Sequence, residues 1–239
     1  MSTTRQKFLD KIRNNLPKAF LPEARPEHPG SFQSYHGQAE APLAQLVERF
    51  SQELQALSGH VHILDDVEEV VPKIAAIAQQ HGARRLLAWA ESGPELIWLH
   101  GGLAEAGLAV VSHQLPANDG ARKTALNEIE DILIGLTGAQ GGLADTGSLA
   151  LVSGSGRGRL ASLLPPVHIA ILAKNKIHPT LPAFLAANPK VTEEGSNLVF
   201  ISGPSRTGDI EMTLSMGVHG PGEVHVIVTP PPGDAPPLA

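Results

Sequence analysis

The sequence predicts an α/β protein built on a mostly parallel sheet. Short, continuously apolar runs, such as residues 86–89 and 108–112, alternate with longer amphipathic segments. Strands that are apolar without interruption are typical of a parallel sheet whose two faces are both covered by helices. With 239 residues, of which 42% are hydrophobic and 18% charged, the chain is able to bury a substantial core.

Composition bears on the class of ligand and on the compartment. Lys and Arg total 18 against 24 for Asp and Glu, a net charge of −6, and aromatic residues make up 4%. Both values disfavour bulk nucleic-acid binding, which needs positive charge and stacking side chains. The absence of cysteine excludes disulfides, thiol nucleophiles and iron–sulfur clusters held by this chain's own thiolates. We expect a cytoplasmic protein without a membrane span and without a cofactor of its own.

The two ends of the chain differ from its middle. Phe8, Leu9, Ile12 and Leu16 fall at helical spacing, which predicts a short amphipathic helix that ends at Pro17. Residues 17–42 are rich in Pro, Gly, Ser, His and Gln, so an N-terminal helix and an irregular linker are expected over residues 1–42, the linker being a tether or part of a site. Residues 43–229 are expected to form a single α/β domain. Residues 230–239 contain five prolines, which predicts an extended or disordered tail.

Within residues 43–229 the elements follow one another in a regular order. Helices are expected at residues 43–57, 66–81, 95–106 and 121–131 from their apolar spacing. Apolar runs predict about eight strands, at residues 61–64, 86–89, 108–112, 132–137, 148–152, 168–172, 198–202 and 224–228. In such sheets ligands bind beyond the carboxyl ends of the strands, so the segments after the strands are candidates for a site.

Residues 153–159, after one such strand, combine glycines with arginines. Gly154 and Gly156 allow backbone amides to approach an anion, while Arg157 and Arg159 supply positive charge and forked donors. A phosphate or a carboxylate would suit this loop. The alternative is a flexible surface turn whose arginines are solvated. The G-x-G-x-G spacing does not match a dinucleotide loop.

Residues 203–211 form a second candidate loop. Ile210, Thr213 and Leu214 predict a short helix after it, ended by Gly217. At the amino end of that helix, an anion would meet the hydroxyls of Ser205 and Thr207 and the Arg206 guanidinium. In the alternative interpretation, Thr207 caps the helix, and the negative charges of Asp209 and Glu211 in its first turn interact favourably with the helix dipole.

Residues 137–148 form the third candidate segment. Asp145 is placed to bind a substrate hydroxyl or act as a base, beside Thr146, Gly147 and Ser148, or it belongs to an Asx turn. His219, ahead of a Gly-Pro-Gly turn, is an acid, a base or a donor, or only a turn residue. We expect the three segments to converge on one concave site.

The histidine and serine patterns give little support to a metal site or to serine hydrolysis. None of the eleven histidines forms a pair at helical ligand spacing with an acid nearby, so no metal site is expected. No G-x-S-x-G sequence is present, which gives serine hydrolysis little support.

Four segments within residues 132–228 together resemble the LUD-domain family. They are Ala144-Asp145-Thr146-Gly147-Ser148, Leu164-Pro165-Pro166-Val167-His168-Ile169, Gly203-Pro204-Ser205-Arg206-Thr207-Gly208-Asp209-Ile210-Glu211 and Gly217-Val218-His219-Gly220-Pro221. The chain departs from the usual family pattern at Asp145 and Ser148, where Glu and Thr are common, and at Gly208, where Ala is common.

The resemblance implies a fold and a role, but it assigns no catalytic residue. The fold would be a three-layer α/β structure similar to the sugar-phosphate isomerase, CoA-transferase and formyltetrahydrofolate cyclo-ligase superfamily. The role would be in the oxidation of L-lactate to pyruvate beside two iron–sulfur proteins, with this chain binding a small anionic metabolite or docking those partners. The alternatives are a free-standing transferase or ligase for a phosphorylated or CoA-linked molecule, and a non-catalytic scaffold. Fold alone does not choose among them.

Overall fold

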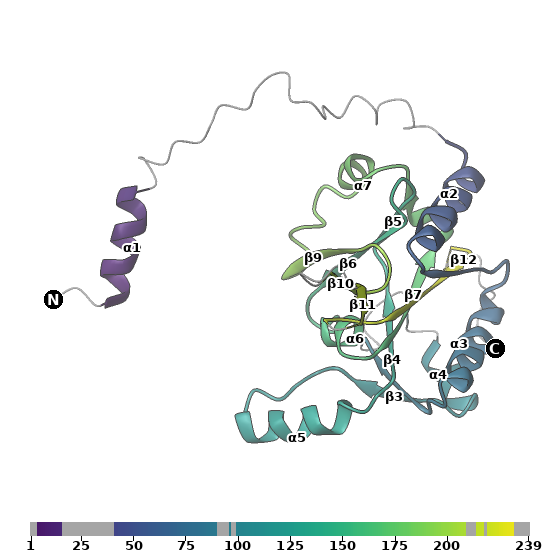
Figure 1. Cartoon of the computed structure of the whole chain (residues 1–239), viewed down its shortest axis with the longest axis horizontal. Helices are drawn as coiled ribbons and strands as arrows, with labels where there is room; N and C mark the ends of the chain where they lie inside the picture. The colour runs from purple at the N-terminus through teal and green to yellow at the C-terminus, as the bar shows by residue number, and fades with distance from the viewer. Residues whose placement is uncertain are drawn as a thin grey trace. The chain divides into compact units, whose positions relative to one another are not determined.

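The computed structural model describes residues 4–15, 41–89, 96, 99–208, 214–217 and 219–231 (Figure 1). The chain divides into two units, Met1–Gly37 and Gln38–Ala239. The described part of the first unit is helix α1 (Thr4–Asn15), which corresponds to the helix expected near residues 8–16. Most of the expected linker and tail lie outside the described residues, as do Leu16 and Pro17.

The second unit is built on a six-stranded sheet in which every neighbouring pair is parallel. Its strand order is β1-β12-β7-β4-β2-β3. In that order the strands are β1 (His60–Ile63), β12 (Glu223–Thr229), β7 (Val167–Ala173), β4 (Ile134–Gly138), β2 (Arg85–Ala88) and β3 (Ala109–Ser112). Every residue of the central strands β4 and β7 is buried, as the continuously apolar runs predict.

Helices cover both faces of this sheet. They are α2 (Leu43–Ala56), α3 (Val70–Gln80) after the short 3-10 helix η3 (Val67–Glu69), α4 (Leu99–Glu105), α5 (Asp119–Ile129) and α6 (Leu160–Leu163). From β1 the chain crosses the sheet to β2 and β3 through helices α3 and α4, and it then returns to β4 and β7 through α5 and α6. Because connections between parallel strands are right-handed, the helices of the outward path (α3 and α4) cover one face and those of the return path (α5 and α6) cover the other. Figure 1 shows α3 and α4 on one side of the central strands and α6 on the other. The expected three-layer, mostly parallel α/β fold is confirmed.

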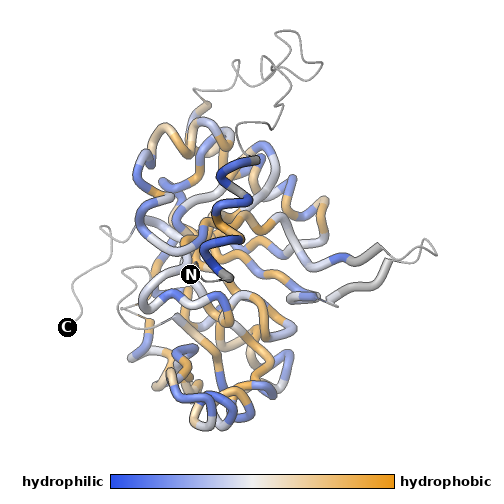
Figure 2. The backbone as a smooth tube through the Cα atoms, turned by 90° about the vertical axis from the view of Figure 1, so that its left-hand side faces the viewer, coloured by the Kyte–Doolittle hydropathy of each residue, from blue (hydrophilic) through white to orange (hydrophobic). Residues whose placement is uncertain are grey.

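The helices follow from their sequences. In α2 the buried residues Val47, Phe50 and Leu54 fall on one face. The side chain of Asn118 accepts hydrogen bonds from the amides of Gly120 and Ala121 and so begins α5. Figure 2 shows the hydrophobic stretches concentrated in the inner strands, whose side chains form the core.

A second sheet of four strands contains two of the strands expected in the first. Its order is β8-β5-β6-β9. The strands are β5 (Gly141–Leu143), β6 (Ser148–Ser153), β8 (Ile177–His178) after the 3-10 helix η4 (Lys174–Lys176), and β9 (Asn197–Ile201). Helix α7 (Leu181–Ala187) packs beside it, with Phe184 in a smaller core of its own. β6 pairs antiparallel with both β5 and β9.

The helix expected after Thr207 is wrong. Arg206–Gly208 forms strand β10, which pairs antiparallel with β11 (Leu214–Met216). Residues 209–213 lie outside the described part of the chain. Ile210, Thr213 and Leu214 are too few positions, and too close together, to distinguish one helical turn from an extended hairpin.

The helices of the second unit are short compared with a bilayer. Among the described residues, none of the helices has both the length and the apolar composition that a membrane crossing needs.

Candidate functional site

A cavity of ≈410 Å³ lies where the segments after β4, β6 and β7 meet. It is lined by Gln140, Arg157, Asn175, Lys176, His178, Ala187, Asn188, Val191 and Glu194. Gln140 lies just beyond the carboxyl end of β4, and Asn175 and Lys176 lie just beyond that of β7. The cavity is thus at the edge of the parallel sheet where ligands bind in this type of fold.

Gln140 is one of the lining residues, and one donor of its side-chain amide is unused. Its Oε1 accepts a hydrogen bond from the backbone amide of Val152 at 2.7 Å, so the side-chain amide is oriented with Nε2 on the other side. Nε2 is buried and has no hydrogen-bond partner within the described structure. Because an unsatisfied buried donor costs about 1–3 kcal/mol, an acceptor oxygen from a ligand would be favoured there.

Arg157 reaches the cavity from a loop that is held in place. The backbones of Gly154 and Arg157 exchange two hydrogen bonds of 3.0 Å each. Trp89, just after β2, donates from Nε1 to the carbonyl oxygen of Gly158 at 3.1 Å, and the Gly158 amide donates to Nε2 of His113 at 2.7 Å. Arg157 itself is half-buried, and its Nη2 donates to the carbonyl oxygen of Glu194 at 3.1 Å. These contacts favour the anion-loop interpretation over a flexible turn.

The charge of the cavity lining favours an anion. Arg157 and Lys176 are cations and Glu194 is an acid. Burial lowers the pKa of His178, so this histidine is neutral near pH 7. Its ring meets that of Phe184 edge to face, with the centroids 5.4 Å apart. The lining therefore combines two cations with the amide donor of Gln140, a set that suits a carboxylate or a phosphate.

The turn that contains Asp145 lies at the other end of the β5–β6 hairpin. The Oγ of Ser148 donates to Oγ1 of Thr146 at 2.8 Å and lies 2.6 Å from Oγ of Ser202, just after β9. Gly147 has a φ of +62°, and a Cβ there would lie 2.3 Å from the backbone nitrogen of Leu54 in α2. The turn is thus packed tightly against α2.

The Asp145 carboxyl group is partly desolvated in this turn. Burial raises its pKa above the ordinary value, although its backbone contacts and the charge of Arg49 act in the other direction. Its Oδ1 is buried and has no hydrogen-bond partner in the described structure. Asp145 is absent from the lining of the cavity around Gln140.

Arg206 was expected at the amino end of a helix, but its side chain contacts the end of another helix, α2. Its Nη2 donates to the carbonyl oxygen of Leu57 at 2.5 Å and to Oγ of Ser58 at 2.9 Å. Both acceptors belong to the carboxyl end of α2, where a cation stabilises the free carbonyls. Because Arg206–Gly208 is a strand that pairs with β11, these described residues do not form the helix amino end on which the expected anion cradle depended.

Ser205 is hydrogen-bonded to the two ends of the loop that contains His219. The Ser205 amide donates to the carbonyl oxygen of Pro221, and the Gly217 amide donates to that of Ser205. His219 is exposed in the loop between Gly217 and Pro221. No contact in the described structure brings His219 to the carboxyl group of Asp145.

The three candidate segments do not share one site, so that expectation is wrong. Ser148 and Ser153 are the two ends of β6. The Gln140 end of the first segment meets Arg157 at the cavity, while its Ser148 end meets Ser202. Arg159 is exposed and does not line the cavity. The length of strand β6 therefore separates the Asp145 turn from the Arg157 loop.

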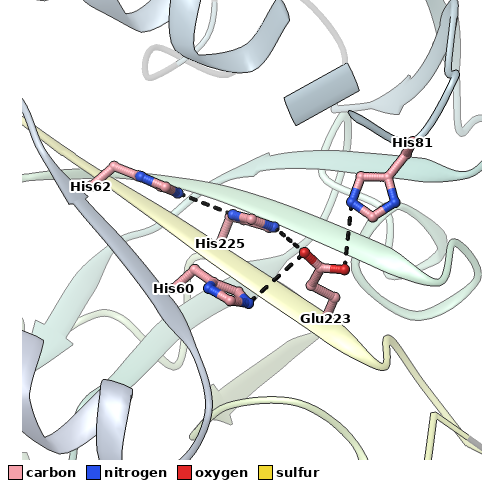
Figure 3. Close-up of polar contacts among 5 residues, drawn as sticks. All are labelled: His60, His62, His81, Glu223 and His225. Carbon is pink, nitrogen blue, oxygen red and sulfur yellow. Dashed lines mark hydrogen bonds and ion pairs between the residues drawn. The ribbon is translucent and has the colours of Figure 1, made fainter. Parts of the chain in front are cut away.

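A cluster of four histidines around one carboxylate was not predicted from the sequence (Figure 3). We call it the His–Glu cluster. It contains His60 and His62 of β1, Glu223 and His225 of β12, and His81 at the end of α3. Nε2 of His225 lies 2.7 Å from Oε1 of Glu223, and Nε2 of His62 lies 3.0 Å from Nδ1 of His225.

The cluster perturbs the pKa values of its members. Burial, and then the positive charge of His225, Lys73 and His60, lower the pKa of His62 to about 4. Burial also lowers the pKa of His225, in spite of its hydrogen bond to Glu223. Partial burial alone would raise the pKa of Glu223, but the hydrogen bond and charge of His225 outweigh it, and the pKa is lowered. Glu223 is therefore ionised and the two histidines are neutral near pH 7.

Spacing along two strands is the sequence signal for this cluster. The sequence reads His60-Val61-His62 and Glu223-Val224-His225. On a strand, residues two apart point to the same face, so each pair faces one way. A strand position for His60 and His62 does not by itself indicate a metal site, because the pairing of β1 with β12, which adds Glu223 and His225, is not visible in the sequence.

Comparisons with known proteins agree with this fold. The family model of the LUD domain matches residues 47–229. A crystal structure of a DUF162 family protein from Deinococcus radiodurans is similar to this chain with a TM-score of 0.58 and 21% sequence identity, covering 80% of this chain and 99% of that one. At this identity the likeness shows a shared fold.

Several curated relatives carry the name lactate utilization protein C, among them one from Halalkalibacterium halodurans and one from Shouchella clausii. The one from Halalkalibacterium halodurans is 33% identical over 159 residues, which are 65% of this chain and 66% of that protein, just under two thirds of its length. The one from Shouchella clausii is 29% identical over 226 residues, which are 92% of this chain and 95% of that protein. Because the family model spans most of the second unit and the fold agrees, the chain belongs to the LUD-domain family.

Proposed function

We propose that this chain is a component of a lactate-utilisation system, in which its cavity binds a small carboxylate of the class of L-lactate and pyruvate. The observation that carries the proposal is that Gln140, whose buried Nε2 has no acceptor in the described structure, lines a cavity together with Arg157. The names of the two relatives support the choice of pathway.

The lining offers what a 2-hydroxy or 2-oxo acid requires. A carboxylate accepts two parallel hydrogen bonds from a guanidinium, and Arg157 presents such a fork. Gln140 would donate to a second oxygen, either of the carboxylate or of the neighbouring hydroxyl or carbonyl group. Lys176 adds a positive charge at the same wall. The cations raise the local concentration of an anionic ligand in spite of the net charge of −6.

The electron-transfer chemistry would belong to partner proteins. This chain has no cysteine, so it supplies no thiolate to an iron–sulfur cluster. We propose that two iron–sulfur proteins oxidise the lactate and dock with this chain in the cytoplasm. The chain would then hold the metabolite, or deliver it, beside the redox centres of its partners.

Growth on lactate tests this function. Deletion of the gene in its host should abolish growth on L-lactate and leave growth on glucose unchanged, and the intact gene should restore growth. An Arg157→Ala gene should restore it poorly. An Arg159→Ala gene, which changes an exposed arginine of the same loop, should restore it fully. Normal growth of the deletion strain on L-lactate would refute the proposed function.

A further inference from the structure

We propose that the His–Glu cluster is a binding site for a divalent transition-metal ion of the Zn²⁺ class, with His60, Glu223 and His225 as its ligands. This site is separate from the cavity around Gln140. His60 and Glu223 are the first residues of β1 and β12, whereas the cavity lies at the carboxyl ends of β4 and β7. The His–Glu cluster is therefore at the amino ends of the parallel strands, and the cavity is at their carboxyl ends.

The sheet itself brings the ligands together. β1 and β12 are parallel neighbours in which His60 pairs with His225. Paired residues of adjacent strands lie on the same face, and so do residues two apart on one strand. His60, Glu223 and His225 therefore project from one face at fixed positions. A site built on strands holds its ligands more rigidly than a site built on loops.

The distances between the donor atoms suit one ion. Each of the three residues offers one ligand atom, and these atoms all lie within 4.8 Å of one another. Oε1 of Glu223 lies 2.7 Å from Nε2 of His225 and 3.8 Å from Nε2 of His60. Ligands at about 2.0–2.1 Å from a tetrahedral ion are roughly 3.3 Å apart. On binding an ion, the contact between Glu223 and His225 therefore opens slightly, and the exposed His60, whose ring is stacked on that of His225 with the centroids 4.6 Å apart, turns toward the ion.

His62 occupies the place of an outer partner to His225. Nε2 of His62 lies 3.0 Å from Nδ1 of His225, the ring nitrogen that faces away from Glu223 (Figure 3). When the Nδ1–H group of His225 donates a hydrogen bond to Nε2 of His62, Nε2 of His225 keeps its lone pair for the ion. Ligating histidines are usually fixed in this way by an acceptor at their second nitrogen.

His81 holds the other oxygen of the carboxylate. Its Nε2 lies 3.4 Å from Oε2 of Glu223, from the end of α3 (Figure 3). This contact leaves Oε1 directed toward His60 and His225. We therefore assign His81 as a positioning residue and leave the fourth position of the ion to water.

Access and ligand chemistry define the class of ion. The side chain of His60 is 53% exposed and that of Glu223 is 33% exposed, so an ion enters from solvent, while His225 at 5% anchors the site inside. Two imidazoles and one carboxylate favour Zn²⁺ or a similar ion over Mg²⁺ or Ca²⁺, which prefer oxygen ligands. An ion here would fasten the edge strand β1 to β12.

Metal titration of the full-length chain, freed of any histidine tag and stripped with a chelator, tests the site. Co²⁺ should bind one per chain and give the visible absorption of a four- or five-coordinate ion. Zn²⁺ should displace it, and competition with a chromogenic chelator gives the affinity. The His60→Asn and Glu223→Gln variants should lose Zn²⁺ affinity by more than about 100-fold, because each removes a ligand.

Further variants separate ligation from folding. The exposed His60 is the safest ligand to replace, and circular dichroism should show that its variant folds. His81→Asn should weaken Zn²⁺ binding by about 10–100-fold, as expected for a positioning residue. His178→Asn, in the cavity at the carboxyl ends of the strands, and Asp119→Asn, an exposed carboxylate of α5, should bind Zn²⁺ like the parent chain. No Co²⁺ absorption in the parent chain, or equal affinity in the folded His60→Asn and Glu223→Gln variants, would overturn the proposal.

Discussion

The backbone amide of Gly158 donates a hydrogen bond to Nε2 of His113 at 2.7 Å. The other ring nitrogen of His113, Nδ1, lies 2.8 Å from the carbonyl oxygen of Ala88 at the end of β2. A carbonyl only accepts, so Nδ1 carries the proton and Nε2 the lone pair, which makes His113 neutral. This one side chain joins the Arg157 loop to the carboxyl ends of β2 and β3. The position of Arg157 in the cavity depends on that connection.

Replacement of Gly158 by alanine should destabilise the protein. A Cβ at this position would lie 2.1 Å from Cδ2 of His113, so the loop or the histidine has to shift. Overpacking of this kind costs about 1–3 kcal/mol. Gly154→Ala in the same loop is the control, because its Cβ would meet nothing closer than 3.5 Å. Urea unfolding measures both, and equal stability of the two variants would contradict the importance of the Gly158–His113 contact.

Gly147→Ala should cost more stability than Gly107→Ala. Both glycines have a positive φ, +62° and +77°, so both substitutions carry the left-handed backbone penalty of about 1–2 kcal/mol. A Cβ at Gly107 would meet nothing within 4 Å, whereas one at Gly147 would lie 2.3 Å from the backbone nitrogen of Leu54. The difference between the two variants in thermal unfolding measures the packing of the Asp145 turn on α2. If Gly147→Ala is no worse, that packing is looser than the structure indicates.

Arg206→Ala should affect stability but not ligand binding, whereas Arg157→Ala should affect ligand binding but not stability. Arg206 bonds to the carboxyl end of α2, so its loss should lower the free energy of unfolding by about 1 kcal/mol or less and leave carboxylate binding unchanged. Arg157 lines the cavity, and its loss should reduce binding with little change in unfolding. Denaturant titration and calorimetry on the same two preparations check both halves. A binding defect confined to Arg206→Ala would return the site to residues 203–208.

Acid should destabilise the fold through His168. This histidine is buried in β7 with Nε2 2.9 Å from Oγ1 of Thr137, and burial lowers its pKa from 6.5 to about 4. The unfolded chain therefore takes up the proton at a higher pH than the folded chain. The stability is complete above about pH 6.5 and is lost as the pH falls through 4, a change of about 3 kcal/mol for this residue. In His168→Gln the free energy of unfolding should fall less between pH 7 and pH 4, and an identical fall would contradict the assignment.

The sequence was sufficient to predict all six strands of the parallel sheet and insufficient to predict how strands pair. The alternation of apolar runs and amphipathic segments predicted the strands because burial on both faces leaves no polar positions in them. It did not place β6 and β9 in a second sheet, since an apolar run reports burial and not the neighbouring strand. The short hairpin of β10 and β11 was mistaken for a helix for a similar reason.

Among the candidate site residues, too, those with a local signal were predicted and those that depend on pairing were not. Arg157 was predicted because glycine and arginine composition is a property of the loop itself. Gln140 was not, because its role depends on the Val152 amide, which occupies Oε1 and leaves the buried Nε2 without a partner. His62 and His225 stand 163 positions apart and meet only when β1 pairs with β12.

Calorimetric titration of the purified chain with L-lactate and with pyruvate tests the carboxylate cavity most directly. We expect saturable binding of at least one of the two. Arg157→Ala should weaken it by about thirtyfold, which corresponds to about 2 kcal/mol, since a charge-assisted pair is lost. Gln140→Glu should weaken it at least as much, because it keeps the acceptor for the Val152 amide and replaces the donor Nε2 with an anionic oxygen. The exposed Arg159→Ala variant should bind like the parent chain. Absence of binding to the parent chain, or unchanged affinity in both cavity variants, would contradict the assignment of this cavity as the carboxylate site.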